Sequence, residues 1–258
     1  MAEKVALVTG GGSGIGKAAA ILLAKQGVAV GVLGRTQTKI DAVVSEISDA
    51  GGQALALQAD VGLEDEMHGA VGHLVKAFGR LDVVVANAGI NGTWAPIDDL
   101  KPEEWDRTID VNLRGTYLTL HAAVPHLKRT GGGSIIIISS INGTRTFTTP
   151  GATAYVATKA AQVAIMQQLS LELAHHRIRV NAICPGAIDT NIDASTSIRH
   201  ENETAIPVIW PEGQVPITGG APGRSEDVAN LIAFLASERS GHITGTPIWI
   251  DGAQGLLR

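Results

Sequence analysis

Short runs of apolar, β-prone residues recur along the chain and predict strands. Several are apolar at consecutive positions, without polar residues between them, which is typical of parallel-sheet strands covered on both faces. The runs are Val5–Val8, Val28–Leu33, Ala54–Leu57, Val83–Ala86, Ile135–Ile138, Arg179–Ile183 and Pro247–Ile250. We therefore expect a parallel sheet of about seven strands.

Longer segments with helical character separate these runs. They are Ile15–Gln26, Lys39–Ala50, Glu64–Phe78, Pro102–Lys128, Tyr155–His175 and Glu226–Ser237. Alternation of strands and helices implies right-handed crossovers. The sequence thus predicts the α/β class, with residues 1–258 forming a single Rossmann-type domain whose doubly wound parallel sheet carries helices on both faces.

One segment, at about residues 191–224, interrupts the alternation. It holds four of the ten prolines and several glycines without a clear period. Because a long irregular loop inside a compact α/β domain is usually functional, we predict a substrate loop or lid here. A disordered insertion is the alternative, and the apolar cluster of Ile206, Val208, Ile209 and Trp210 makes it less favoured.

A glycine-rich turn follows the first apolar run and opens the first helical segment, in the order Thr9-Gly10-Gly11-Gly12-Ser13-Gly14-Ile15-Gly16. Glycines allow a tight turn and bring backbone N–H groups against a pyrophosphate at the positive end of a helix. A flexible turn would explain the glycines equally well, but strand, glycines and helix stand in the order that dinucleotide binding requires. We predict cofactor contacts from Gly10, Gly12, Ser13, Gly14, Ile15 and Gly16.

The end of the second run bears on cofactor choice. An NAD site carries an acid there for the ribose hydroxyls, whereas this chain has Gly34, Arg35 and Thr36. Arg35 could instead pair with a 2′-phosphate, although it could also be a solvated loop residue, and the glycine turn adds no second basic residue. The missing acid favours NADP(H) over NAD(H), with Arg35 and Thr36 as contacts.

Tyr155 and Lys159 stand at i and i+4 of a predicted helix, which places the phenol and the ammonium on one face. A nearby cation lowers the pKa of a phenol below its usual value of about 10 and makes it a better proton donor or base. The pair alone would be no more than a chance surface pair.

Together, these motifs resemble the short-chain dehydrogenase/reductase family over nearly the whole chain. The matching residues are Thr9-Gly10-x-x-x-Gly14-x-Gly16, Asp60-Val61, Asn87-Ala88-Gly89, Asn112, Ser140, Tyr155-x-x-x-Lys159, and Pro185-Gly186 followed by Thr190. Their order and spacing together are highly specific.

The resemblance implies a role for each matching residue. Asp60 and Val61 would hold the adenine, Asn87, Ala88 and Gly89 would pack beside the cofactor, and Pro185, Gly186, Ile188 and Thr190 would lie at the nicotinamide, with Ile188 and Thr190 on its carboxamide. Ser140 would polarise the substrate carbonyl and Tyr155 would transfer the proton. Lys159 would bind the ribose and lower the tyrosine pKa, and Asn112 would position a water that links Lys159 to solvent.

The chain departs from the family pattern between Ser140 and Tyr155, where the spacing is two residues longer than is common. We interpret this as an insertion within residues 144–153, with Ser139 the less favoured catalytic serine. Residues 93–100, 144–153 and 191–224 are expected to form the substrate site. Trp94, Phe147 and Trp210 are equally consistent with pocket lining and with core or lid packing.

The predicted function is reversible hydride transfer between NADP(H) and a ketone, aldehyde or secondary alcohol. The 3-oxoacyl-thioester reductase and the sugar or secondary-alcohol dehydrogenase branches both remain open. The alternatives are an NAD-dependent dehydrogenase, an isomerase or dehydratase on the same fold, and a non-catalytic NADP(H) sensor. The family also implies a homotetramer.

Composition bears on binding partners, cellular location and metal content. A net charge of −5 gives no support for nucleic-acid binding. Cys184 is the only cysteine, so no intrachain disulfide can form, and we expect it to be a buried core residue. Without a signal-like N-terminus or an apolar stretch near the roughly 20 residues that span a bilayer, a cytoplasmic protein with no membrane partner is expected. The eight histidines show no metal-ligand spacing, so we expect no catalytic metal.

Overall fold

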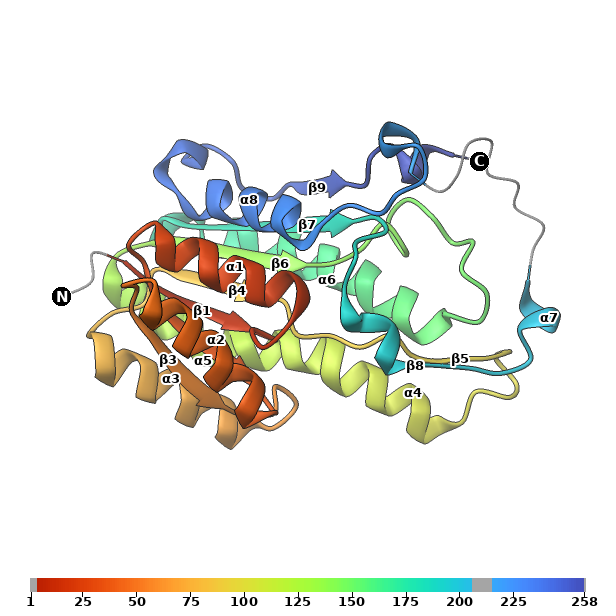
Figure 1. Cartoon of the computed structure of the whole chain (residues 1–258), viewed down its shortest axis with the longest axis horizontal. Helices are drawn as coiled ribbons and strands as arrows, with labels where there is room; N and C mark the ends of the chain where they lie inside the picture. Colours follow the sequence, from red (N-terminus) through yellow and green to blue (C-terminus); the bar gives the residue numbers. More distant parts are fainter. Residues whose placement is uncertain (1–3, 206–214, 258) are drawn as a thin grey trace.

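A parallel sheet of seven strands runs through the centre of the structure, a computed structural model that describes residues 4–205 and 215–257. Its strand order is β3-β2-β1-β4-β6-β7-β9 (Figure 1). The strands are β1 (Val5–Thr9), β2 (Ala29–Gly34), β3 (Ala54–Gln58), β4 (Val83–Ala86), β6 (Gly133–Ile138), β7 (Ile178–Pro185) and β9 (Pro247–Ile250). All seven predicted runs are therefore confirmed.

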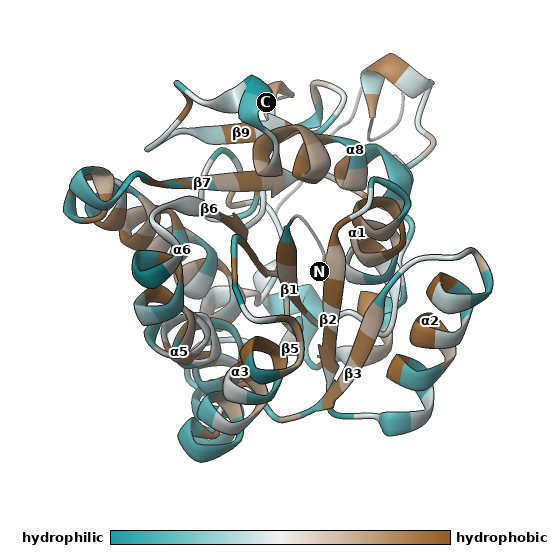
Figure 2. Ribbon diagram, turned by 90° about the vertical axis from the view of Figure 1, so that its left-hand side faces the viewer, coloured by the Kyte–Doolittle hydropathy of each residue, from teal (hydrophilic) through white to brown (hydrophobic). Residues whose placement is uncertain are grey.

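Helices cover both faces of this sheet, as Figure 2 shows. One face carries α1 (Gly14–Lys25), α2 (Gln37–Asp49) and α8 (Ser225–Ala236), and the other carries α3 (Glu64–Phe78), α5 (Gly115–Thr130) and α6 (Thr153–Glu172). The consecutive apolar residues of the central strands alternate between two buried clusters, one under each helical layer. The predicted single-domain, doubly wound fold is confirmed.

The single helix predicted over Pro102–Lys128 is wrong in detail, because the structure divides it. Helix α4 (Pro102–Ile109) leads into a π-helical turn, Asp110–Arg114, which continues directly into α5. The wider turn holds the buried Asn112, whose side chain bonds to Ile90 instead of to its own helix. Such π segments inside α-helices frequently occur at functional sites.

A second, two-stranded parallel sheet lies beyond the main one and was not predicted. It pairs β5 (Gly92–Trp94) with β8 (Thr196–Ile198), and each strand is too short to give a pattern in the sequence. Strand β8 and the short helix α7 (Glu201–Thr204) belong to the predicted loop at about residues 191–224. The apolar cluster predicted at Ile206, Val208, Ile209 and Trp210 lies outside the described residues. Within the described part, no helix is both long and apolar enough to cross a membrane.

Candidate active site

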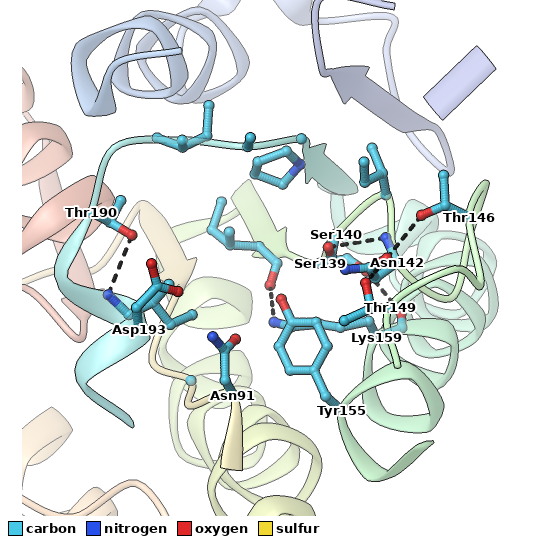
Figure 3. A pocket seen from close by; sticks show the side chains of 18 of the residues that line it. Asn91, Ser139, Ser140, Asn142, Thr146, Thr149, Tyr155, Lys159, Thr190 and Asp193 are labelled. Atoms are coloured by element: carbon cyan, nitrogen blue, oxygen red, sulfur yellow. Dashed lines mark hydrogen bonds between the residues drawn. The ribbon is translucent and has the colours of Figure 1, made fainter. Parts of the chain in front are cut away.

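The carboxyl ends of the central strands open onto a large cavity. Chain order in the sheet reverses between β1 and β4, and ligands of open α/β sheets bind at such a switch point. A cavity of about 620 Å³ lies here, with Asn87 after β4, Ser139 and Ser140 after β6, and Gly186 after β7 along its walls. Figure 3 shows the polar side chains that face it.

The glycine turn is built so tightly that side chains are excluded from it. A Cβ on Gly16 would lie 2.3 Å from the Gly10 carbonyl oxygen and 2.6 Å from Asn87 Nδ2. Gly10 and Gly14 have φ values of +65° and +50°, which favour glycine. The turn therefore presents bare backbone at the N-terminus of α1, as a phosphate cradle requires.

Asn87 fastens the end of β4 to this turn. Its Nδ2 donates to the Thr9 carbonyl oxygen at 2.9 Å, and the backbone N–H groups of Asn87 and Ala88 donate to Thr9 Oγ1 at 3.0 and 3.1 Å. The predicted Asn87-Ala88-Gly89 motif thus holds β1 and β4 in register at the switch point. Gly89 borders both the large cavity and a second one.

The second cavity, of about 200 Å³, lies on the other side of the glycine turn. Its lining includes these predicted cofactor residues: Gly10, Gly12, Ser13, Arg35, Thr36, Asp60, Val61, Ala88 and Gly89. Lys39 also lines it, and sequence reasoning did not single out this residue. Its position four residues after Arg35, in the first turn of α2, is the signal that could have identified it.

Arg35 already has one partner in this second cavity. Its Nη1 lies 3.6 Å from Asp60 Oδ2, with the arginine side chain 58% exposed. The carboxylate therefore orients the guanidinium at the cavity edge without satisfying all of its N–H groups. Arg35 and Lys39 thus both line this cavity, for which the sequence had indicated a single cation.

Five further predicted cofactor residues lie along the large cavity. They are Ile15, Pro185, Gly186, Ile188 and Thr190. Gly186 is tied to β9 through its N–H and the Ile250 carbonyl oxygen at 3.0 Å. Thr190 caps the following turn through its Oγ1, which accepts from Ile192 N–H at 3.4 Å. The two cavities together are thus lined by every position that the motifs assigned to the cofactor except Gly14 and Gly16, which belong to the glycine turn between them.

Tyr155, Lys159 and Ser140 converge on the same wall of the large cavity (Figure 3). All three are buried, and Lys159 Nζ lies 5.4 Å from the centre of the Tyr155 ring. Lys159 Nζ donates to the Ile138 carbonyl oxygen at 3.0 Å, which holds it beneath the tyrosine. Ser139 Oγ donates to the Lys159 carbonyl oxygen at 2.8 Å, so Ser140 is the serine with its hydroxyl available to the cavity.

The pKa shift of Tyr155 differs in direction from the sequence expectation. Burial raises the pKa of Tyr155, and only a hydrogen bond with Ser140 opposes that effect. The lowering expected from Lys159 is therefore not found, because desolvation of the phenolate dominates. Burial also lowers the pKa of Lys159 to about 8, against a smaller opposing effect from Cys184.

Asn112 lies beneath these residues, in the π turn. Its Oδ1 accepts from Ile90 N–H at 2.8 Å, and its Nδ2 donates to the Ile90 carbonyl oxygen at 2.9 Å and to Thr158 Oγ1 at 3.2 Å. The side chain therefore fixes the loop after β4 against α6. Its role in positioning a water that links Lys159 to solvent stays a prediction.

Each of the three predicted substrate segments contributes to the cavity. Trp94 comes from the first, Thr146, Thr148, Thr149 and Pro150 from the second, and Ile192, Asp193 and Pro222 from the third. Phe147 is 68% exposed and does not line the cavity, and Trp210 lies outside the described residues. Of the three aromatic candidates, Trp94 alone is thus placed at the cavity.

Arg199, which sequence reasoning missed, anchors the third segment. Its guanidinium reaches Asp99 Oδ2 at 2.9 Å and Glu104 Oε1 at 2.6 Å. The backbone N–H of Arg199 donates to the Trp94 carbonyl oxygen at 2.9 Å. The guanidinium holds the pKa of Glu104 at about 2. No sequence pattern links Arg199 to acids about a hundred residues earlier, so only the fold reveals this contact.

Two further expectations concern cysteine and metal. Cys184 is fully buried, as predicted, and burial raises the pKa of its thiol. We predicted no catalytic metal, yet Glu64, His68 and His121 place one ligand atom each within 4.8 Å of one another on the exposed surface of α3 and α5. They are not among the residues that line the two cavities.

A glycine cradle, two cavities joined at Gly89 and a tyrosine–lysine–serine group define the site of a Rossmann-type dinucleotide-dependent oxidoreductase. Comparison with known proteins agrees. The family described as short chain dehydrogenase matches residues 4–201, and the chain belongs to this family. It is thus an oxidoreductase that uses a nicotinamide cofactor.

Named relatives cover almost the whole chain. The chain is 38% identical over 253 residues to a 3-oxoacyl-[acyl-carrier-protein] reductase FabG of Staphylococcus aureus, spanning 96% of this chain and 97% of that protein. It is 37% identical over 251 residues to a cyclohexanol dehydrogenase of an Acinetobacter species, at 97% and 94% coverage.

Solved structures give the same picture. A 3-ketoacyl-ACP reductase from Sinorhizobium meliloti superposes with a TM-score of 0.95 at 70% identity, covering 98% of this chain and all of the other. A 3-ketoacyl-(acyl-carrier-protein) reductase from Brucella melitensis, complexed with NADH, superposes with a TM-score of 0.86 at 33% identity and 98% coverage of both chains.

Proposed function

We propose that the protein is an NADP(H)-dependent ketoreductase that reversibly reduces a ketone or aldehyde to an alcohol. The observation that carries this proposal is the convergence of Tyr155, Lys159 and Ser140 on one cavity wall beside the glycine cradle. An isomerase or dehydratase is not favoured, because the family and its named relatives are oxidoreductases. A non-catalytic sensor would have no use for this side-chain group.

The cofactor fits the residues present. The adenosine end would occupy the cavity bordered by Asp60 and Val61, the pyrophosphate would lie on the bare backbone between Gly10 and Gly16, and the nicotinamide end would reach Thr190. When bound, the nicotinamide supplies or accepts the hydride at its C4. Every other part of the reaction falls to side chains of this chain.

In the proposed mechanism, Tyr155 moves the proton. Its buried hydroxyl keeps its proton at neutral pH because burial raises its pKa, so in reduction it is ready to protonate the substrate oxygen. The Ser140 hydroxyl, beside the phenol, would donate to the same oxygen as negative charge develops on it. The Lys159 ammonium would contact the ribose and stabilise the phenolate after proton transfer.

Arg35 and Lys39 support NADP(H) as the preferred cofactor. Both line the cavity that would hold the adenosine ribose, and neither Gly34 nor Thr36 is acidic. Two cations would attract a 2′-phosphate, whereas the ribose hydroxyls of NAD(H) would find no acid at the end of β2. The Asp60 carboxylate is already engaged by Arg35.

We further propose that the protein is a cytoplasmic homotetramer. An apolar groove on the outer face of α5 and α6 is lined by Leu120, Val124, Ile165 and Leu169. Tyr117, which also lines it, is 53% exposed. A second copy of this face would cover those side chains. Sedimentation velocity at micromolar concentration tests the proposal, and a monomer would refute it.

A panel of carbonyl compounds and alcohols, assayed with both NADPH and NADH, tests the proposed function. We expect net NADPH oxidation that depends on a carbonyl substrate, with a lower KM for NADPH than for NADH. Substrate conversion without cofactor turnover would support an isomerase or dehydratase instead. Cofactor binding without any conversion would support the sensor.

A further inference from the structure

The part of the large cavity beyond Tyr155 and Ser140 carries a set of polar side chains in its lining. They are Asn91, Asn142, Thr146, Thr148, Thr149 and Asp193, and apolar residues such as Trp94, Pro150, Ile192 and Pro222 also line the cavity. Figure 3 shows Asn91, Asn142 and Asp193 among them. A long alkyl chain would need a continuous apolar channel, because only an apolar lining makes its transfer from water favourable in free energy. The polar side chains would interrupt such a channel on their side of the cavity.

Asn142 is held so that one end of its amide is occupied and the other is available. Its Oδ1 accepts from Thr146 Oγ1 at 2.8 Å and from Thr149 Oγ1 at 3.1 Å, and its backbone N–H donates to Ser140 Oγ at 3.1 Å. Its Nδ2 has no hydrogen-bond partner among the described residues. A positioned N–H donor thus lies two residues from the serine that faces the reacting oxygen.

Asn91 shows the complementary arrangement. Its Nδ2 donates to Thr196 Oγ1 at 2.8 Å and its backbone N–H to Ser195 Oγ at 3.0 Å, while its Oδ1 has no partner among the described residues. Figure 3 shows Asn91 and Asn142 on either side of Tyr155. The cavity therefore presents an amide acceptor and an amide donor flanking the proton-transfer residue.

Neither free amide atom is sealed inside the protein. In the described ranges, the buried side-chain polar atoms without a partner are Gln162 Oε1 and Arg179 Nη1, so the unpaired atoms of Asn91 and Asn142 retain access to the cavity. Their surroundings are also braced, because the backbone N–H of Ala95, directly after β5, donates to the carbonyl oxygen of Gly151, in the 144–153 segment, at 3.2 Å. Polar groups held in this way are preorganised for a ligand.

The charged side chains of the cavity lining indicate the charge of the ligand. Lys159 is the one cationic side chain among the described residues that line the cavity, and its Nζ already bonds to Ile138 beneath Tyr155. Asp193 adds a carboxylate at the opposite wall. An anionic substrate would therefore lack a free counter-charge and would face a carboxylate, whereas neutral hydroxyl groups can donate to Asp193 and Asn91 and accept from Asn142.

Resting on the proposed ketoreductase function, we infer that the substrate is a small, uncharged, hydroxylated ketone or aldehyde, such as a sugar- or polyol-derived carbonyl compound. Asn142 and Asn91 are its specificity-determining residues. The same cavity must hold the nicotinamide end of the cofactor, which leaves only part of about 620 Å³ for the substrate. The alkyl chain of a long 3-oxoacyl thioester would leave both amides without partners.

The test compares three probes with NADPH: a hydroxylated four-carbon ketone (erythrulose), an alkyl ketone of similar size (2-pentanone), and the N-acetylcysteamine thioester of 3-oxooctanoate. We expect kcat/KM for erythrulose to exceed the other two by at least about tenfold, the effect of one additional hydrogen bond to a site that otherwise leaves its amide unpaired. A preference for the thioester or the alkyl ketone would overturn the inference while leaving the ketoreductase function intact.

Variants make the assignment specific. Asn142→Leu keeps the side-chain size and removes the amide, and we expect it to lower kcat/KM for erythrulose about tenfold, chiefly through KM, while 2-pentanone reduction is unchanged or faster. Asn230→Leu, at an exposed position of α8 outside the lining of both cavities, is the matched control and should change neither. An equal loss on both ketones, with unchanged melting temperature and NADPH binding, would refute the role of Asn142. Absence of turnover on every carbonyl, despite NADPH binding, would refute the proposed function itself.

Discussion

Replacing Arg35 with Ala should change cofactor preference while leaving the chemistry intact. Arg35 lies at the edge of the adenosine-side cavity with its guanidinium 58% exposed, so its attraction for a 2′-phosphate is screened by water. A unit charge pair at about 4 Å in water contributes about 1 kcal/mol, and a phosphate with nearly two charges about twice that. The existing pair with Asp60 offsets part of this gain.

The expected net loss is therefore about 1.4 to 2 kcal/mol, or roughly 10- to 30-fold in kcat/KM for NADPH. NADH lacks the 2′-phosphate, so its kcat/KM should change less than about twofold. Lys39→Ala should act in the same direction, and the double variant should lose more than either single variant.

Steady-state rates with NADPH and NADH, at one saturating carbonyl concentration, measure the effect directly. Arg129→Ala is the matched control, because Arg129 is exposed and lines neither the large cavity nor the adenosine-side cavity. Equal losses with both cofactors in Arg35→Ala would refute the assignment of this cation to the 2′-phosphate.

Three further outcomes follow from the site geometry. Because burial lowers the pKa of Lys159 to about 8, kcat/KM for NADPH should fall as pH rises through 8, and a flat profile from pH 7 to 9.5 would contradict this. Gly16→Ala should lower the melting temperature and weaken NADPH binding, at a cost of about 1 to 3 kcal/mol, since its Cβ would lie 2.3 Å from the Gly10 carbonyl oxygen. Glu104, whose pKa of about 2 reflects its pairing with Arg199, should stabilise the fold above pH 4.5 and lose that effect as pH falls toward 2. The melting-temperature difference between wild type and Glu104→Gln should therefore shrink over that interval, and a constant difference would show that the pair does not contribute.

The main sheet and its helices were predictable because burial on both faces leaves continuous apolar runs. Strand β4, Val83–Ala86, is an example, since all four of its residues are buried. The division of α4 from α5 was not predictable, because Asn112 terminates regular α-helix through contacts with Ile90 and Thr158 that are remote in sequence. The β5–β8 pairing was equally hidden, since it joins two three-residue segments about a hundred residues apart.

The cofactor and Tyr155–Lys159 motifs were visible in the sequence because backbone conformation and helical spacing determine them locally. Lys39, Arg199 and Asn142 were missed for a different reason, since each acquires its role from tertiary neighbours. The direction of the Tyr155 pKa shift could not be inferred either, because desolvation depends on how deeply the fold buries the phenol.

The Tyr155→Phe variant tests the central claim most directly, because it removes a single oxygen from a buried ring. We predict that carbonyl-dependent NADPH oxidation falls at least about 1,000-fold, as expected for loss of the proton donor, while the Kd for NADPH stays within about twofold of wild type. Retention of more than about a tenth of wild-type turnover would contradict the proposal that this hydroxyl transfers the proton.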